Sequence, residues 1–462
     1  MTKYVLAADF GPSHKSFYEP NSNEVLKTID LLEGKKSLRF GIRHAIRDLS
    51  KLGIYPSEVG LDLLVLALMV QAADTRLNRI QTSQNSWSRE IKIVVPVSDI
   101  NLWSTSDLKE NLRKMLNFLT GDFWEIEFVS RPEEFQKLIE KGTVERADYQ
   151  GVSLFSGGLD SLIGAIDLLD SKTVPLFISH AGDAAVSGTQ GDLFSKIAKH
   201  YESKKCIINR LRFVSARFPR DFAPNIKTEN STRGRSFLFF AIAAFAGTGL
   251  EKSFDLRVPE NGLIALNVPL DPTRLGSLST RTTHPYYIHR WNELLKTIGI
   301  NGNVVNPYWN KTKGEMVEEC KDQTLLKSVT KMSVSCAHPA SVNQYHGGGK
   351  IYHCGNCVPC IIRRASIERA WGKGIDDTSY KLGNFTGRKF DTLKAEGKQI
   401  RGFQYALSNL QKHKTAAGLM IHKSGPLLED VKILSELSGV FERGMKEVES
   451  LLEGAETGPD NG

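Results

Sequence analysis

A short glycine-containing turn is the first place in this sequence where chemistry is expected. Residues 156–161 read Ser-Gly-Gly-Leu-Asp-Ser, between a strand-like stretch at 151–155 and a helix-like stretch at 161–170. Glycines let a backbone approach an anion closely, serines supply hydroxyl donors, and a helix start presents free N–H groups and the positive end of its dipole. The sequence therefore predicts a phosphate-binding loop, although the lysine of the common phosphate loop is absent.

Each residue of this loop has an expected role. The set is Ser156, Gly157, Gly158, Leu159, Asp160 and Ser161. The two glycines are expected to adopt positive φ and to leave room for a phosphate. Asp160 is expected either to hold a metal ion on the phosphate or to cap the helix. A serine hydrolase is disfavoured, because leucine stands where the nucleophile elbow needs its first glycine.

Four cysteines crowd into a segment of 25 residues near the C-terminal third of the chain. They are Cys336, Cys354, Cys357 and Cys360, of which the last three form C-x2-C-x2-C. Four thiolates satisfy a tetrahedral structural zinc and leave no open position for catalysis, so the site would stabilise a loop-rich segment. An iron–sulfur cluster is the alternative. His338, His346 and His353 are possible substitutes as ligands.

From residue 149 the sequence alternates between strand-like and helix-like stretches. Such alternation predicts an α/β fold in which helices cover both faces of a parallel sheet. Nucleotides bind where the first strand of such a sheet turns into its helix. We expect this nucleotide-binding core to span residues 149–330.

The rest of the chain divides into three further predicted parts. Residues 1–148 read as an additional α+β domain, a scaffold or a docking site for a partner, with a buried apolar helix at 61–73. A four-cysteine module with its following helix is expected at 331–384. A helical extension is expected at 385–462, and its last residues, 455–462, read as frayed.

Composition and charge exclude few classes of function. The 462 residues carry a formal net charge of +8, which suits a phosphate-bearing substrate but is weak evidence for nucleic-acid binding. The longest apolar run is shorter than the ~20 residues that a membrane-spanning helix needs. The start of the chain also lacks the apolar core of a signal peptide. We expect a cytoplasmic protein without membrane contact.

The loop, in its strand-to-helix context, resembles the pyrophosphate loop (PP-loop) of the ATP pyrophosphatase superfamily. Members of that superfamily cleave ATP between the α and β phosphates and adenylate an oxygen of their substrate. Together with "SC…CGNCVPCIIRRA…DDTSY", the loop resembles the 7-cyano-7-deazaguanine synthase (QueC) family over about residues 150–380. The resemblance implies an adenine-nucleotide alpha-hydrolase-like core that uses ATP, Mg²⁺ and Zn²⁺.

The chain also departs from that family. It is longer at its N-terminus, and residues 259–287 differ from the family's shorter loop. In these respects it is similar to the QueC-like proteins of bacterial antiphage systems such as the Qat system. That resemblance implies a ligase that adenylates a 7-deazaguanine carboxylic acid and couples it to an amine. The expected acceptor is the N-terminus of a partner protein from the same defence operon.

The resemblance and the residue types together suggest roles for individual side chains. Asp160, Ser161 and Arg235 are the expected catalytic residues, and His180 is expected near the adenosine. Residues 186–190 are expected to form an access loop. The candidates for substrate binding are Arg233, Asn261, Arg281, Thr283 and His284, with Glu260, Arg274 and Thr282 as further loop residues.

Two other functions remain open at this point. The first is a 7-cyano-7-deazaguanine (preQ0) synthase that makes the free nitrile from 7-carboxy-7-deazaguanine, ammonia and ATP. The second is a non-catalytic scaffold that binds ATP within a defence complex. A tRNA-modifying enzyme of the superfamily is disfavoured, because no dense basic segment indicates a tRNA-binding surface.

Overall fold

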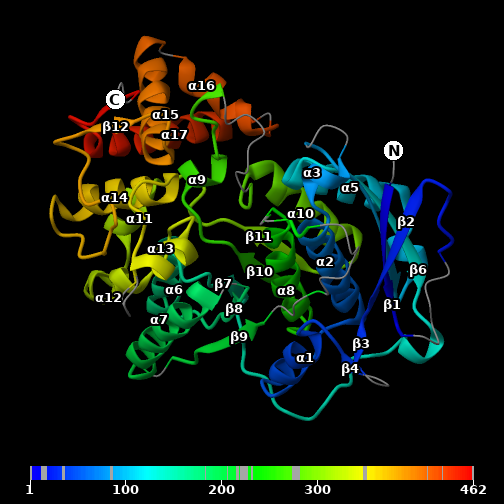
Figure 1. The fold of residues 1–462 in the computed structure, drawn as a ribbon. Coiled ribbons are helices and arrows are strands. Elements are labelled where there is room, and N and C mark those ends of the chain that lie inside the picture. The colour runs from blue at the N-terminus through cyan, green and yellow to red at the C-terminus, as the bar shows by residue number, and fades with distance from the viewer. Residues whose placement is uncertain are drawn as a thin grey trace.

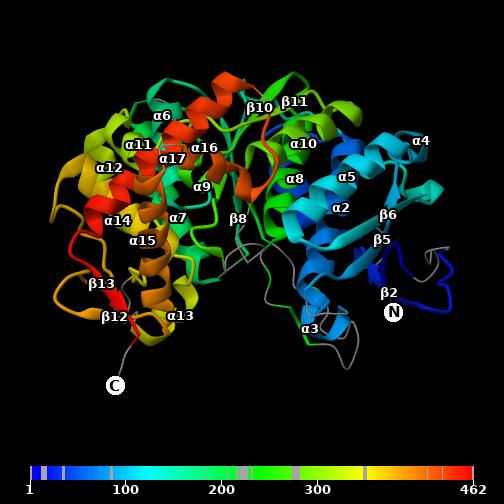
Figure 2. The same ribbon diagram turned by 90° about the horizontal axis from the view of Figure 1, so that it is seen from above.

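Two parallel β-sheets and a C-terminal group of helices make up the molecule (Figure 1). This computed structural model describes residues 3–11, 18–33, 37–83, 87–182, 184–204, 206–214, 218, 227–229, 231, 233–272, 281–346, 351–413, 415–428 and 430–459. Figure 2 shows the N-terminal sheet and the C-terminal helices on opposite sides of the central sheet.

The N-terminal sheet has four parallel strands in the order β2-β1-β5-β6. Their bounds are Lys3–Asp9 (β1), Glu24–Asp30 (β2), Glu90–Val97 (β5) and Phe123–Ser130 (β6). All-parallel pairing with helical crossovers makes this region α/β rather than the predicted α+β. The domain boundary at residue 148 stays a prediction.

Helices α2 (Glu58–Arg76) and α5 (Ser106–Thr120) pack against this sheet. Helix α2 contains the predicted apolar segment and is buried around most of its circumference. The smaller elements of the region are β3 (Leu32–Glu33), β4 (Ser37–Leu38), α1 (Ile42–Ser50), α3 (Arg79–Thr82), α4 (Ile100–Trp103) and η2 (Glu133–Phe135). Helix α5 ends at Gly121, which is its left-handed C-cap with φ 74°.

The central sheet confirms the predicted parallel arrangement. Its order is β11-β10-β7-β8-β9, and every neighbouring pair is parallel. The bounds are Val152–Leu154 (β7), Leu176–His180 (β8), Asn209–Phe213 (β9), Phe254–Arg257 (β10) and Gly302–Val305 (β11). In chain order the strands read 3-2-1-4-5, so the direction of winding reverses between β7 and β10.

Helices cover both faces of the central sheet. On one face lie α6 (Leu159–Asp170) and α7 (Ala184–Glu202), together with α11 (Lys313–Glu319) and α12 (Gln323–Val329). On the other face lie α8 (Arg235–Thr248) and α10 (Pro285–Thr297). Helix α8 packs directly against α2, and one continuous apolar core therefore unites this face with the N-terminal sheet.

The C-terminal residues form their own apolar core on the far side of the central sheet. Its elements are α9 (Gly262–Leu266), α14 (Val358–Trp371), α15 (Ala395–Lys412), α16 (Ala416–Met420), η5 (Ile421–Ser424) and α17 (Val431–Leu451). The predicted frayed end is partly wrong, because β13 (Glu456–Gly458) pairs with β12 (Lys389–Asp391). The remaining elements before α14 in the chain are η4 (Thr330–Met332), which contacts α12, and α13 (Pro339–His346), which contacts α7.

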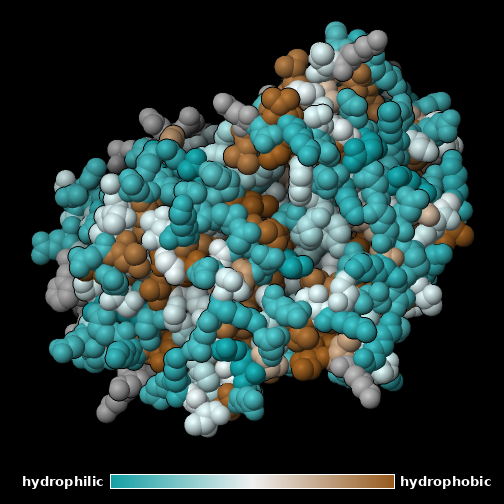
Figure 3. Space-filling view, turned by 180° about the vertical axis from the view of Figure 1, so that it is seen from behind, coloured by the Kyte–Doolittle hydropathy of each residue, from teal (hydrophilic) through white to brown (hydrophobic). Residues whose placement is uncertain are grey.

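No helix in the described part of the chain combines the length and apolarity needed to cross a bilayer. Figure 3 shows a mostly hydrophilic face on which apolar residues occur in separate small groups.

Candidate functional site

The glycine-containing loop lies at the carboxyl edge of the central sheet. It leaves the end of β7 and leads into α6, and β10 ends beside it. Because the winding direction reverses between these two strands, their loops separate and leave a crevice in which α/β proteins bind ligands. The fold therefore places the predicted phosphate loop at the position where ligand binding is expected.

The loop backbone fits an anion site, with one change from the prediction. Gly157 has φ 83°, which favours glycine, and a Cβ there would lie 3.2 Å from the Gln190 side chain. Gly158 instead has φ −80° and is the N-cap of α6, so of the two glycines only Gly157 uses positive φ. Gly158 has no side chain to cap the first amides of α6, and the Leu159 amide donates to the Ser335 hydroxyl at 3.4 Å. The hydroxyls of Ser156 and Ser161 lie 3.0 Å apart beside these amides.

Side chains of α7 and β8 hold the loop in place by donating to its backbone carbonyl groups. The Gln190 amide donates to the carbonyl oxygens of Phe155 (3.1 Å) and Ser156 (3.0 Å), and the Ser179 hydroxyl donates to Phe155 (2.9 Å). The predicted access loop at 186–190 is wrong, since these residues lie within helix α7. This helix supplies the buried Gln190 that orients the loop carbonyls.

Asp160 is held by two residues that come from distant parts of the sequence. One carboxylate oxygen accepts from the Asn261 side-chain amide at 2.8 Å and from its backbone N–H at 3.3 Å. The other oxygen lies 3.0 Å from the Lys313 Nζ, and both charged side chains are buried. Asn261 also caps α9 through its side-chain oxygen. Asp160 itself does not act as the N-cap of α6, so the expectation that it caps this helix is wrong.

Lys313 is the functional residue that the sequence analysis missed. It is 5% exposed and begins α11, and its ammonium group lies beside Asp160 at the loop. The available signal was the capping box of Thr312 and Glu315, which marks a helix start. The loop that lacks a lysine of its own thus has one supplied by another helix.

Glu260 is a second acid at this edge, shortly after the end of β10. Desolvation raises the pKa of its carboxyl group to about 7, and the nearby Asp160 adds to this rise. The Thr283 hydroxyl donates to its carboxylate, and the Asn306 side chain donates to its carbonyl oxygen at 2.7 Å. A carboxyl group with a pKa near neutrality can exchange a proton during a reaction at physiological pH.

The Glu260→Gln variant is expected to be more stable than the parent protein above pH 7. The native carboxyl keeps its proton where the unfolded chain, with a pKa near 4.5, has lost it. Native stability therefore falls as pH rises from about 4.5 to about 7, by on the order of 3 kcal/mol. Urea unfolding at several pH values measures this loss. An equal pH slope in both proteins would contradict the assignment.

His180 and Arg235 lie beside each other at the same edge. His180 ends β8 and is buried, and its pKa is lowered to about 3 by desolvation and by the Arg235 guanidinium. The imidazole is therefore neutral at physiological pH. Arg235 is the first residue of α8 and is partly exposed.

Arg233, Arg281 and His284 have partners away from the loop. Arg233 donates to the carbonyl oxygen of Thr120, and Arg281 donates to that of Phe118 at 2.9 Å. Both cations thus complement the negative C-terminal end of α5. His284 accepts from the backbone N–H of Tyr286 and lies 3.2 Å from the Ser424 hydroxyl. The structure brings Asn261 and Thr283 to the loop but not these three residues. Arg274 lies outside the described residues.

The four cysteines form one buried cluster. Their Sγ atoms all lie within 4.8 Å of one another, and those of Cys354 and Cys360 are 3.8 Å apart. A tetrahedron with Zn–S bonds of about 2.3 Å has sulfur atoms about 3.8 Å apart. The backbone N–H of Cys357 donates to the Cys354 Sγ at 3.3 Å, and that of Cys354 donates to the Cys336 Sγ at 3.4 Å. Hydrogen bonds from the other cysteines, together with the Cys357 N–H, lower the pKa of Cys354. The cluster can hold a metal ion.

The predicted alternative ligands lie elsewhere. His338 donates its backbone N–H to the Cys336 Sγ at 3.4 Å, and His353 packs against Tyr380. The side chain of His346 lies outside the described residues. Within the described residues the cysteines alone form a group with metal-binding spacing.

The cysteine module touches the glycine-containing loop directly. The Val334 N–H donates to the Gly157 carbonyl at 2.9 Å, and the Leu159 N–H donates to the Ser335 hydroxyl at 3.4 Å. Arg363 is fully buried and donates to the hydroxyl of Ser333 at 2.7 Å. The segment before Cys336 is therefore fixed by the cluster at one end and supports the loop along its length.

Comparisons with known proteins add no further constraint on the site. No family model, no curated protein and no solved structure matches the chain. The site is therefore defined by its geometry alone. A glycine-containing loop, a buried lysine–aspartate pair and a glutamate with a raised pKa meet at one edge of a parallel sheet, and the segment before the four-cysteine cluster contacts the loop.

Proposed function

We propose that this chain is an ATP-dependent carbon–nitrogen ligase of the QueC-like type found in antiphage systems such as Qat. One observation carries the proposal. The Ser-Gly-Gly-Leu-Asp-Ser loop follows the first strand of a 3-2-1-4-5 sheet, at the point where winding reverses, and Lys313 supplies a buried positive charge there. This combination suits release of pyrophosphate from ATP, because charge develops on the departing group.

In this proposal the loop binds the β and γ phosphates of ATP. The hydroxyls of Ser156 and Ser161, which lie 3.0 Å apart, would turn their protons to the phosphates, and the start of α6 would present the positive end of its dipole to the same anion. Asp160 keeps the Lys313 ammonium beside the loop. His180, neutral and buried at the end of the neighbouring strand β8, would be near the adenosine.

Asp160, whose carboxylate is already paired with Lys313 and Asn261, is the acid of the loop that could also approach Mg²⁺ on the phosphates. Bound Mg²⁺ would neutralise phosphate charge. The four-cysteine cluster would hold Zn²⁺, with a structural role, because all four positions of the ion are filled by protein.

The proposed reaction has two balanced steps. A carboxylate oxygen of a 7-deazaguanine acid attacks the α-phosphorus of ATP, and pyrophosphate leaves. An amine nitrogen then attacks the acyl carbon, the C–O bond to AMP breaks, and an amide forms. Glu260, with its pKa of about 7, accepts the proton that the attacking nitrogen loses. The acceptor would be the N-terminus of a partner protein.

The expected result with ATP, 7-carboxy-7-deazaguanine and the neighbouring operon proteins is AMP, pyrophosphate and a mass increment on one partner. Intact-protein mass spectrometry detects the increment, and the AMP released should match it in amount. A second reaction, in which ammonia replaces the partner proteins, tests whether the chain makes the free nitrile. Nitrile formation without a conjugate would favour the preQ0 synthase, and ATP binding without AMP release would favour a scaffold.

A further inference from the structure

Helix α17 of the C-terminal extension packs against the starts of two helices, α9 and α11, that begin beside the loop. A Cβ on Gly444 would lie 2.8 Å from the Leu263 side chain, so α17 closely approaches α9. One turn further along, Glu447 meets the start of α11. Helix α9 follows Asn261, and α11 begins with Lys313. These are the two residues that hold Asp160.

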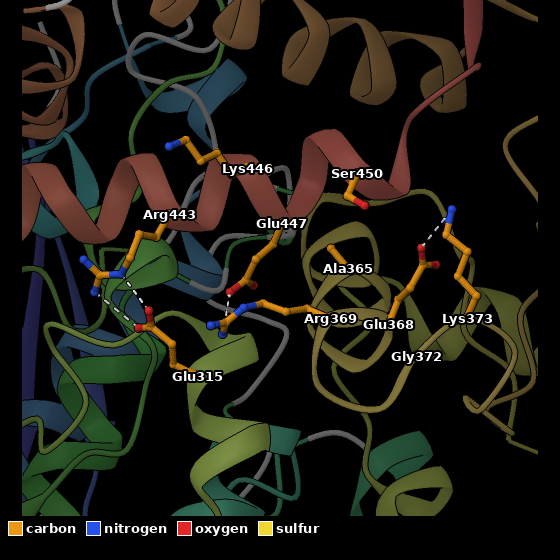
Figure 4. A pocket seen from close by; sticks show the side chains of 10 residues that line it. All are labelled: Glu315, Ala365, Glu368, Arg369, Gly372, Lys373, Arg443, Lys446, Glu447 and Ser450. Carbon is orange, nitrogen blue, oxygen red and sulfur yellow. Dashed lines mark hydrogen bonds and ion pairs between the residues drawn. The ribbon is translucent and has the colours of Figure 1, made fainter.

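Glu447 makes the contact with α11 through its carboxylate. It accepts a hydrogen bond from the hydroxyl of Thr312, the N-cap of α11, and another from the Gly314 N–H at 3.2 Å. The side chain is buried, with the residue 8% exposed. Arg369 of α14 lies 3.2 Å away and balances the buried charge, as Figure 4 shows. An acid at this end of a helix also meets the positive end of its dipole.

Neighbouring contacts strengthen the same junction. Arg443, one turn before Glu447, forms an ion pair with Glu315 at 2.6 Å (Figure 4). It also donates to the carbonyl oxygen of Asn310 at 2.8 Å. Residues on both sides of Lys313 are thus fixed to α17. The Lys313 side chain leaves this fixed backbone and reaches Asp160.

We infer that Glu447 is a positioning residue for the nucleotide site, which sets the place of the Lys313 ammonium by fixing the start of α11. The C-terminal extension is then part of the machinery that orients the phosphate loop. The inference rests on the proposed function only for its effect on catalysis, since the position of Lys313 can be measured without ATP turnover.

The test compares Glu447→Gln with Glu442→Gln, the same change at an exposed position of α17. The full-length proteins are treated with N-hydroxysuccinimidyl acetate, and acetylation of Lys313 is followed by peptide mass spectrometry. Because Lys313 is buried and paired, it should react slowly in the parent protein and in Glu442→Gln, and several-fold faster in Glu447→Gln. Equal rates in the two variants would overturn the inference.

Steady-state kinetics gives the second measurement. Glu447→Gln should raise the KM for ATP as well as lower kcat, whereas a smaller folded fraction would lower kcat alone. If the parent protein releases no pyrophosphate, the proposed function fails while the acetylation result still decides the role of Glu447.

The variant Arg369→Gln serves if Glu447→Gln does not fold. It leaves both hydrogen bonds of Glu447 in place and should give a smaller rise in Lys313 acetylation. No rise would contradict the inference.

Discussion

Lys313→Met is expected to lower the rate of pyrophosphate release by roughly 100-fold to 1000-fold, the usual effect of removing one charge-stabilising group from an active site. The side chain of methionine keeps most of the volume of lysine but cannot balance charge on the departing phosphates. The rate is measured by a coupled pyrophosphate assay with saturating ATP and the deazaguanine acid. Lys311→Met is the matched control, because Lys311 lies two residues earlier and pairs with Glu319 at the surface.

The free energy of unfolding of Lys313→Met must be measured as well as its activity. Loss of Lys313 leaves Asp160 buried without its cation, which costs about 3–5 kcal/mol in comparable sites. The double variant Asp160→Asn/Lys313→Met removes both charges and should recover part of this stability without recovering activity. Recovery of stability and activity together, or wild-type activity in Lys313→Met, would show that Lys313 serves folding alone.

Cys360→Ser is expected to remove the bound metal and most of the activity. Cys360 is fully buried within the cluster, and its Sγ lies 3.8 Å from that of Cys354. A three-thiolate site binds zinc more weakly, and binding energy at a structural zinc is folding energy. Since Val334 and Ser335 hydrogen-bond to the loop, release of this segment should also lower pyrophosphate release more than about tenfold, by the loss of positioning.

Metal analysis of the purified protein checks this expectation. The parent protein should carry about one zinc per chain, and Cys360→Ser should carry little and unfold at a lower temperature. Cys206→Ser is the control, because Cys206 is partly exposed and lies outside the cluster. Iron and sulfide in the parent protein, in place of zinc, would contradict the zinc assignment.

The central sheet and the location of its loop could be predicted because they depend on local patterns. Each strand of a parallel sheet is a short apolar run, and each crossover helix repeats its apolar residues with a helical period. The loop between Leu154 and Leu162 needs only its neighbours in sequence to be recognised. The cysteine cluster was predictable for the same reason, since two-residue spacing brings successive sulfur atoms together.

The partners of the loop could not be predicted, because they depend on which distant helix starts meet one sheet edge. Lys313 begins a helix that its capping box announces, yet nothing local indicates that it faces Asp160. Arg233 and Arg281 stay predicted substrate-binding residues. Nothing in the local sequence indicates that each donates to a carbonyl group at the end of α5.

The packing of α2 against α8 limits how this protein can change over time. Arg89, in the N-terminal region, is buried between Asp74 and Asp122, and Asp74 also accepts from the Gly234 N–H at the start of α8. The N-terminal region shares an apolar core and buried charges with α8. Replacing it as a whole by the matching region of another protein would therefore break these contacts. Any new partner specificity carried by residues 1–148 would therefore have to arise by substitutions on their outer surface, while the inner face stays matched to α8.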